Sequence, residues 1–386
     1  MRKKAQLILK RKIRGDSIIQ LKDGKILTYY FREYYDIYIY HEKTFENILE
    51  LDLYKPIYEY EKEKEKNENK LKDKKEDNIV NKNDYFRYKY GGRSKNKISI
   101  KELYNGTILI GINNYLIELN LIKKNYNYKI VKYLDNIILD VNELSDKRII
   151  VFTNEKIIIL KREKEEYIIK ECYPIKENWK TIIIGAIYKH YGDFCQYFSS
   201  VELPGNRLLL NSFLIVKEYH DTGCVRGPPT EFCNSKIIFI DMNNFEEIKS
   251  TKTFKVDIKY IILENYIAIQ SDKRTFLYDI NSLNLIKEIR HFSEYDIFCQ
   301  FENKYIIRNS SYGENYTLTF YKIKNNNLIE HFKVESFLFN YLFFDSYSGI
   351  KRFEKNLFIL RDKRIIIFIL DEIFILKFPI DEIELK

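Results

Sequence analysis

The residues with the clearest metal-binding chemistry lie in the stretch 211–235, where Gly, Pro and Cys cluster. Zinc takes four nitrogen or sulfur ligands in a tetrahedron. The candidates are His220, Cys224 and Cys233, with Cys195 or His190 as a fourth ligand. Their gaps of three and eight residues match no common zinc finger. A Cys224–Cys233 disulfide and an ordered loop with free thiols explain the same residues, so we predict no metal and no cofactor but leave the zinc question open.

Three acidic residues, Asp140, Glu143 and Glu202, fall on or beside expected strands, where paired carboxylates could act as general acid and base. The same positions also suit carboxylates that only cap turns. The chain has no Gly-rich phosphate loop before a helix, no nucleophile elbow and no His-Glu-x-x-His sequence. We therefore expect a protein without enzymatic activity.

Seven short phrases of one type recur along the chain, each with a large apolar residue before a polar turn and a β-rich run after it. They are Gln20–Gly24, Glu102–Gly106, Glu143–Asp146, Glu202–Gly205, Ile262–Asn265, Gln300–Asn303 and Arg352–Lys355. The shortest intervals between them are about forty residues, the size of a four-stranded propeller blade. The 386 residues therefore predict a single all-β domain over 1–386, a seven-bladed β-propeller of four-stranded antiparallel blades with three loop insertions.

The third and fifth units show the expected strands most plainly. In the third unit they cover 136–142, 148–153, 156–161 and 167–172, and in the fifth 258–263, 266–270, 275–280 and 285–290. Each run is rich in Ile, Tyr, Phe or Val and is bounded by turn residues. Several runs are almost continuously apolar, which is typical of strands packed on both faces.

The segment Ser271–Leu283 is similar to the later part of a WD40 repeat, with Tyr278-Asp279 in place of the Trp-Asp pair. Ile240–Phe245 and Tyr40–Phe45 are weaker copies. The chain has no Gly-His pair, and its only tryptophan, Trp179, is not at a pair position. The resemblance is therefore to divergent WD40-like repeats. It implies a non-enzymatic scaffold that binds partner proteins on a face of the toroid.

Two segments compete to complete the last blade. The C-terminal unit is predicted to supply its own outer strands over 357–360, 364–370 and 373–378, yet Gln6–Ile13 is also a predicted strand. In WD40-like toroids the N-terminal strand typically completes the last blade. One of these strands is then a fifth, peripheral one.

The three insertions differ in composition. The first, 61–96, begins with seven Lys and seven acidic residues over 61–78, which predicts a solvated, disordered loop or, as the alternative, a short charged helix. The second lies in 179–198, and the third is the Gly, Pro and Cys loop 211–235. In the third, Tyr219, Arg226 and Phe232 are the candidate partner-binding residues.

Positive charge gathers in two segments of a chain with net charge +9. Residues 1–14 carry +7, and residues 82–97 carry +5 with alternating aromatic and basic side chains. Arg87, Lys89 and Arg93 are therefore candidate anion-binding residues, which could stack on bases or dock at an anionic surface. The alternative function is binding of RNA or phosphoinositide headgroups through these two segments.

We expect an intracellular protein, cytoplasmic or nuclear, because five unevenly spaced cysteines do not suggest a disulfide framework and no transmembrane segment is evident. The leading prediction is a protein-interaction scaffold whose partners the sequence does not identify. A glycan-acting propeller enzyme that uses carboxylates near the channel is the second alternative.

Overall fold

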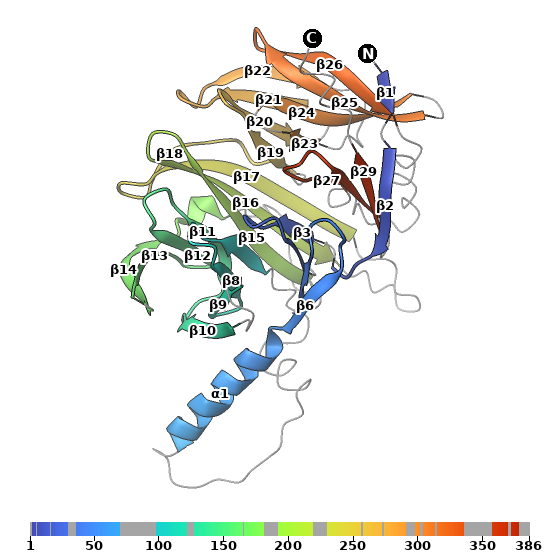
Figure 1. The fold of residues 1–386 in the computed structure, drawn as a ribbon. Helices are drawn as coiled ribbons and strands as arrows, with labels where there is room; N and C mark the ends of the chain where they lie inside the picture. The colour runs from blue at the N-terminus through green and yellow to red at the C-terminus, as the bar shows by residue number, and fades with distance from the viewer. Residues whose placement is uncertain are drawn as a thin grey trace, which may run out of the picture. The chain divides into compact units, whose positions relative to one another are not determined.

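The fold is given by a computed structural model of the whole chain. It describes residues 2–4, 6–15, 17–29, 36–69, 98–121, 127–164, 166–180, 192–218, 230–255, 258–271, 274–290, 298–301, 304–312, 315–335, 357–369 and 372–377. Almost all of these residues lie in β-strands and the turns between them (Figure 1).

Seven sheets form the described part of the chain, and we number them as blades 1 to 7. Blade 1 holds β3 (Ser17–Gln20), β4 (Ile26–Tyr29), β5 (Asp36–Tyr40) and β6 (Asn47–Asp52). Blade 2 holds β7 (Ser99–Glu102), β8 (Ile108–Ile112), β9 (Tyr115–Asn120) and β10 (Asn127–Tyr133). Blade 3 holds β11 (Ile138–Glu143), β12 (Ile149–Thr153), β13 (Lys156–Glu163) and β14 (Glu166–Pro174).

Blade 4 holds β15 (Gly192–Leu203), β16 (Arg207–Glu218), β17 (Thr230–Asp241) and β18 (Glu246–Ser250). Blade 5 holds β19 (Lys259–Ile262), β20 (Tyr266–Ser271), β21 (Arg274–Asp279) and β22 (Leu285–Arg290). Blade 6 holds β23 (Phe298–Phe301), β24 (Tyr305–Tyr312), β25 (Asn315–Lys324) and β26 (Asn327–Glu335). Blade 7 holds β27 (Leu357–Ile359), β28 (Ile365–Ile369), β29 (Glu372–Lys377) and β2 (Gln6–Lys12).

The prediction of a seven-bladed β-propeller with four-stranded antiparallel blades is confirmed. The second and third strands of most blades are rich in apolar residues, as is typical of strands buried between packed sheets. Strands β8 and β12, for example, are buried at every position. The strands predicted for the third and fifth units match β11–β14 and β19–β22 within a few residues.

The N-terminus contributes to two blades, which resolves the competition described above. Strand β2 pairs antiparallel with β29 and is the outermost strand of blade 7, as the WD40 resemblance implies. Strand β1 (Arg2–Lys4) pairs parallel with β26 and gives blade 6 a fifth strand. The innermost strand of blade 7 is β27, so its phrase is the turn that begins at Leu360. The predicted phrase at 352–355 lies outside the described residues.

The chain divides into two compact units, each with its own core. The unit made of 31–37 and 51–257 contains blades 2 to 4. There Phe152 and Phe198 meet edge to face at 6.0 Å, between blades 3 and 4. The single tryptophan, Trp179, is fully buried in the same cluster, and its indole Nε1 donates a hydrogen bond to Glu247.

The other unit is made of 1–30, 38–50 and 258–386. One of its core clusters joins blades 7 and 1, where Ile366, Ile373 and Ile375 pack with Ile26 and Tyr38. A second cluster joins blades 5 and 6. Each blade thus covers its apolar face with a neighbouring sheet, because a single four-stranded sheet has no other way to bury both faces.

Helix α1 (Tyr54–Asn69) begins before the predicted insertion and occupies its first residues (Figure 1). This is the charged helix that the sequence left as an alternative, and residues 70–97 lie outside the described part. The first turns dock on blade 2, where Ile57 and Glu61 are buried and Glu61 accepts a hydrogen bond from the Tyr115 hydroxyl. Lys64 lies 4.5 Å from the ring of Tyr133 on β10.

The three WD40-like segments fold into one kind of turn between the third and fourth strands. Residues Phe45, Phe245 and Leu283 each adopt a left-handed conformation, with φ of 53°, 55° and 56°, and each is buried. Each backbone N–H bonds to the carbonyl four residues earlier. In the turn after β21, Asp279 Oδ1 accepts from the amide of Ser282 at 2.6 Å. The three segments that resemble WD40 repeats thus share one turn conformation at the same place in blades 1, 4 and 5.

Candidate functional site

A side chain that ends the first strand of a blade holds the first turn of the preceding blade. Glu143 at the end of β11 accepts a hydrogen bond from the backbone amide of Tyr104 at 2.5 Å. Glu202 near the end of β15 accepts from the amide of Ser145 at 2.7 Å and from its hydroxyl at 2.6 Å. In both cases the accepting glutamate directly precedes the apolar residue of its own phrase. The donating residue directly follows the apolar residue of the phrase one blade earlier.

Blades 7 and 1 use the same contact with a different side chain. Gln20, which ends β3, accepts a hydrogen bond through Oε1 from the amide of Arg361 at 2.7 Å. Its Nε2 faces Glu42 Oε1 at 3.4 Å. The neutral amide therefore both accepts and donates, which a carboxylate in its place would not do.

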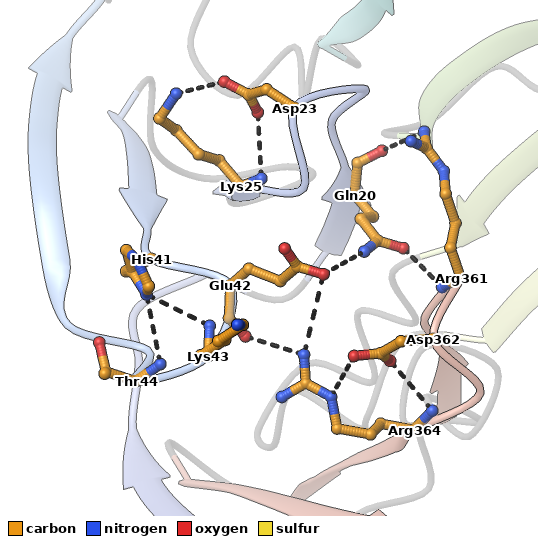
Figure 2. Close-up of polar contacts among 10 residues, drawn as sticks. All are labelled: Gln20, Asp23, Lys25, His41, Glu42, Lys43, Thr44, Arg361, Asp362 and Arg364. Carbon is orange, nitrogen blue, oxygen red and sulfur yellow. Dashed lines mark hydrogen bonds and ion pairs between the residues drawn. The ribbon is translucent and has the colours of Figure 1, made fainter.

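Around Gln20 lies the group of polar side chains drawn in Figure 2, and we call it the turn cluster. It comprises Gln20, Asp23, Lys25, His41, Glu42, Lys43, Thr44, Arg361, Asp362 and Arg364. Its members come from the turns after β3, β5 and β27. Those turns meet because Gln20 and Arg361 are hydrogen-bonded.

Two arginines tie the three turns together (Figure 2). Arg361 donates through its guanidinium to the carbonyl oxygens of Lys22 at 3.2 Å and Gln20 at 3.4 Å. Arg364 donates to the carbonyl oxygen of Glu42 at 3.1 Å and forms an ion pair with Asp362, where Nε lies 2.6 Å from Oδ2. A planar guanidinium with several fixed donors suits such multiple contacts better than an ammonium group does.

The backbone of the turn cluster is fixed locally as well. Asp23 and Asp362 each accept a hydrogen bond from the amide two residues ahead, at 3.0 and 3.2 Å. At Gly24, φ is +91° and a Cβ atom would lie 2.1 Å from a Glu42 carboxylate oxygen, so only glycine fits. The cluster is thus a rigid base that carries the exposed side chains of His41 and Lys43.

The turn cluster combines charged groups of both signs with hydrogen-bonding groups. Its three acids alternate with cations, and its only imidazole, His41, hydrogen-bonds the amide of Lys43 through Nδ1 at 3.3 Å. No group of three or more His, Cys, Asp or Glu side chains in the described part of the chain is arranged to hold a metal ion. The turn cluster presents the exposed side chains of His41 and Lys43 beside its half-buried polar contacts.

The predicted carboxylates all make structural contacts between blades. Besides Glu143 and Glu202, Asp140 is buried and accepts hydrogen bonds from Ser99 Oγ at 3.0 Å, Ser200 N at 2.7 Å and Ser200 Oγ at 2.6 Å. Asp140 thereby joins the inner strands of blades 2, 3 and 4. The sequence alone did not separate turn caps from catalytic acids; in the structure Glu143 and Glu202 hold turns of the preceding blade, and Asp140 links inner strands.

A buried ion pair that the sequence did not indicate joins blades 2 and 3. Glu118 on β9 accepts from Arg162 Nη2 at 3.1 Å and from the Tyr167 hydroxyl at 2.5 Å. Burial, together with the carboxylate of Glu118, raises the pKa of the Tyr167 phenol well above its usual value. Tyr167 therefore stays protonated and keeps donating to the carboxylate.

Of the predicted partner-binding residues, Tyr219 and Arg226 lie outside the described residues. Phe232 lies on β17, opposite Val216 of β16. Strands β16 and β17 run as far as residues 218 and 230, so the chain between them is 219–229. The predicted anion-binding residues Arg87, Lys89 and Arg93 also lie outside the described part.

The structure describes only part of the zinc candidate. His190, His220 and Cys224 lie outside the described residues. Cys195 on β15 and Cys233 on β17 share one register position, since both stand opposite Ile215 of β16. Their backbones are therefore two strands apart, about 10 Å. The zinc question stays a prediction.

Gln20 and Arg361 were not predicted as contact residues, although the phrases themselves contain a relevant pattern. The first position of the phrases is Glu or Gln in five of the seven that were recognised, at residues 20, 102, 143, 202 and 300. Both side chains carry an acceptor oxygen at the same reach. That regularity predicts an acceptor for a neighbouring amide more directly than it predicts catalysis.

Comparisons with known proteins identify no relative. No protein-family model matches the chain, and no curated protein does. Among solved structures, a chain of the "Crystal Structure of Mitotic Checkpoint Complex" is similar over 73% of this chain and 86% of that one, with 10% identity and a TM-score of 0.34. In the described residues, no helix is long and apolar enough to cross a membrane.

Proposed function

We propose that this protein is a non-enzymatic scaffold that binds partner proteins on a face of its propeller. The observation that carries the proposal is the use of polar side chains at the blade turns. Asp140, Glu143, Glu202 and Gln20 all hold backbone or side-chain groups of adjacent blades. The turns are thereby fixed in place, and a fixed surface loses little conformational entropy on binding a partner.

The turns and loops supply the groups that would contact partners. The turn cluster carries exposed charged and polar side chains on a hydrogen-bonded base, and such groups give specificity and steer association. The residues 219–229, with Tyr219 and Arg226, and the neighbouring Phe232 have side chains typical of interface hot spots. We propose these three residues as the partner-binding anchors.

The test is an affinity pull-down from the native cell with three versions of the full chain. One is unchanged, one has residues 219–229 replaced by a Gly-Ser linker, and one has Tyr219→Ala with Arg226→Ala. The linker replacement keeps β16 and β17, whose pairing from 207 to 241 forms the centre of blade 4. We expect specific partners with the unchanged chain and their loss with both variants.

Two results would count against the proposal. Partners retained at equal yield by both variants would rule out residues 219–229 as the binding site. A purified chain that turns over a glycan substrate, and loses that activity with Glu143→Gln or Glu202→Gln, would replace the scaffold by an enzyme. Thermal unfolding of each variant separates lost binding from lost folding.

A further inference from the structure

Strand β2 differs in charge from the fourth strands of most other blades, whereas β1, the outermost strand of blade 6, is likewise basic and free of acids. Strands β6, β14, β18, β22 and β26 all carry at least one acidic residue, whereas β2 carries none. Instead it holds three consecutive cations, Lys10, Arg11 and Lys12, and all three are exposed. Strand β10 also lacks acids, but helix α1 packs against it.

Apolar side chains are exposed beside these cations. Leu7 is 42% exposed and Ile8 is 51% exposed, while Leu9 turns toward the core between blades 7 and 1. A β-bulge falls at Ile8, because the ladder with β29 steps from Leu7 opposite Leu376 to Leu9 opposite Ile375. From Leu9 to Lys12 the register is regular. An added strand can therefore pair with the regular stretch Leu9–Lys12, which lies next to the bulge and the exposed side chains of Leu7 and Ile8.

Glu50 and Glu372 are acidic residues on strands that neighbour this charge. Glu50 on β6 is engaged with Arg14, whose Nη1 lies 3.0 Å away. Glu372 stands opposite Lys12 in the ladder, and Lys10 lies 5.2 Å from the ring of Phe374. Arg11 stands opposite Ile373, so no acid faces it across the ladder.

The chain itself shows that a blade of this protein accepts an extra strand at its rim. Strand β1 pairs with β26 through Arg2, Lys3 and Lys4 and makes blade 6 five-stranded. Among the described strands, β2 pairs with β29 alone, so blade 7 has four. Strand addition supplies affinity through main-chain hydrogen bonds, and alternating side chains supply specificity.

We propose that β2 binds an extended acidic segment of a partner protein, which adds to blade 7 as a fifth strand. Residues directly opposite each other in a ladder lie on the same face. The segment would place acids at alternate positions opposite Lys10 and Lys12 and an apolar side chain opposite Leu7 or Ile8. This proposal names a partner class and rests on the scaffold function proposed above.

The probe is a fluorescein-labelled peptide of about nine residues in which Glu and Val alternate, a length that matches an ordinary strand. Binding is measured by anisotropy to the full chain. We expect saturable binding by the Glu-Val peptide and none by its Lys-Val counterpart. Methylation of alternate backbone amides removes ladder hydrogen bonds without changing charge, so it should weaken binding by at least about tenfold.

Matched variants locate the site. Lys10→Glu with Lys12→Glu should weaken binding by about tenfold, because each reversal replaces an attraction by a repulsion. Lys129→Glu with Lys132→Glu on β10 makes the same charge change elsewhere and should leave affinity within about twofold. If the reversals unfold the chain, Lys10→Gln with Lys12→Gln gives a smaller loss in the same direction.

Four results would overturn the proposal. They are no binding by the unchanged chain, equal binding of the methylated peptide, equal loss from the β10 variant, and tighter binding of oligothymidylate or phosphatidylserine vesicles than of the peptide. The last result would favour the nucleic-acid or membrane alternative. Because replacing 219–229 leaves β2 unchanged, failure here and failure of the scaffold proposal are separate outcomes.

Discussion

Two turns with the same sequence pattern are held by different side chains. Leu144–Arg148 in blade 3 and Leu360–Arg364 in blade 7 share the residues Asp, Lys and Arg at their last three positions. In both, Asp accepts from the Arg amide and pairs with the Arg Nε, and Lys adopts a left-handed conformation. Glu202 caps the first turn, and Gln20 caps the second.

The surroundings explain the exchange of Glu for Gln. Ser145 presents both an amide and a hydroxyl to Glu202, so two donors face two carboxylate oxygens. Gln20 faces one amide donor and, on its other side, the carboxylate of Glu42 at 3.4 Å. A carboxylate at residue 20 would lie beside another carboxylate. The backbone contact is therefore constant, and local charge selects the side chain that makes it.

The largest effect is expected where a carboxylate link is buried. Asp140→Ala removes the acceptor for Ser99 Oγ, Ser200 N and Ser200 Oγ and leaves these donors unsatisfied inside the sheet stack. We expect a loss of about 2–3 kcal/mol in the free energy of unfolding, measured by urea denaturation. Asp140→Asn keeps one acceptor and should lose about half as much.

The control for Asp140 is Asp146→Ala, which removes an exposed turn carboxylate of the same blade. That change should cost less than about 1 kcal/mol. Equal losses for Asp140 and Asp146 would mean that the buried links between blades 2, 3 and 4 contribute little beyond an ordinary turn contact.

The second prediction exchanges the two capping side chains. Gln20→Glu should destabilise the chain by about 1 kcal/mol, because it removes a donor to Glu42 and adds a like charge. Glu143→Gln keeps an acceptor oxygen for the Tyr104 amide and should cost about 0.5 kcal/mol. Both values come from denaturant unfolding at low salt, where surface repulsion is least screened.

A double-mutant cycle sharpens this comparison. Adding Glu42→Gln to Gln20→Glu restores one neutral partner and should recover most of the loss. A loss that persists unchanged in the double variant would show that repulsion by Glu42 is not the cause.

Features whose residues lie close together in the chain were predicted from the sequence, whereas contacts between distant residues were not. The blades were predictable because each unit repeats apolar runs and turn residues in the same order, as in β19–β22. The WD40-like turns were predictable for the same reason, since Asp279 and Leu283 lie in one turn. The pairing of β2 with β29 joins residues at opposite ends of the chain, so residue patterns left it undecided.

The seventh phrase shows where local reasoning failed. Arg352–Lys355 has the right residue types, but the turn that Gln20 caps begins at Leu360, after β27. Residues Leu357–Leu360 were expected to form an outer strand, whereas β27 is the innermost one. The contacts of Gln20 and Glu202 are also long-range. In the sequence they are indicated only by the recurrence of Glu or Gln at the first position of the phrases.

The third prediction tests whether the arginines of blade 7 act through geometry or charge. Arg361→Lys keeps the charge but loses the planar fork that reaches the carbonyl oxygens of Lys22 and Gln20. We expect a loss of about 0.5–1 kcal/mol that changes little with added salt, since its acceptors are neutral. A loss abolished by salt would indicate instead that nearby acids dominate the contact.

The smallest effect should separate the two matched turns themselves. Asp146→Asn and Asp362→Asn both keep the oxygen that accepts from the Arg amide and lose the ion pair with the Arg Nε. Only in blade 7 does the same Arg, Arg364, also donate to the carbonyl of Glu42. We therefore expect Asp362→Asn to cost about 0.5 kcal/mol and Asp146→Asn less, because loosening Arg364 also weakens its contact with blade 1. Arg364→Gln combined with Asp362→Asn should then cost less than the sum of the two single changes, whereas strict additivity would show that Asp362 does not position Arg364.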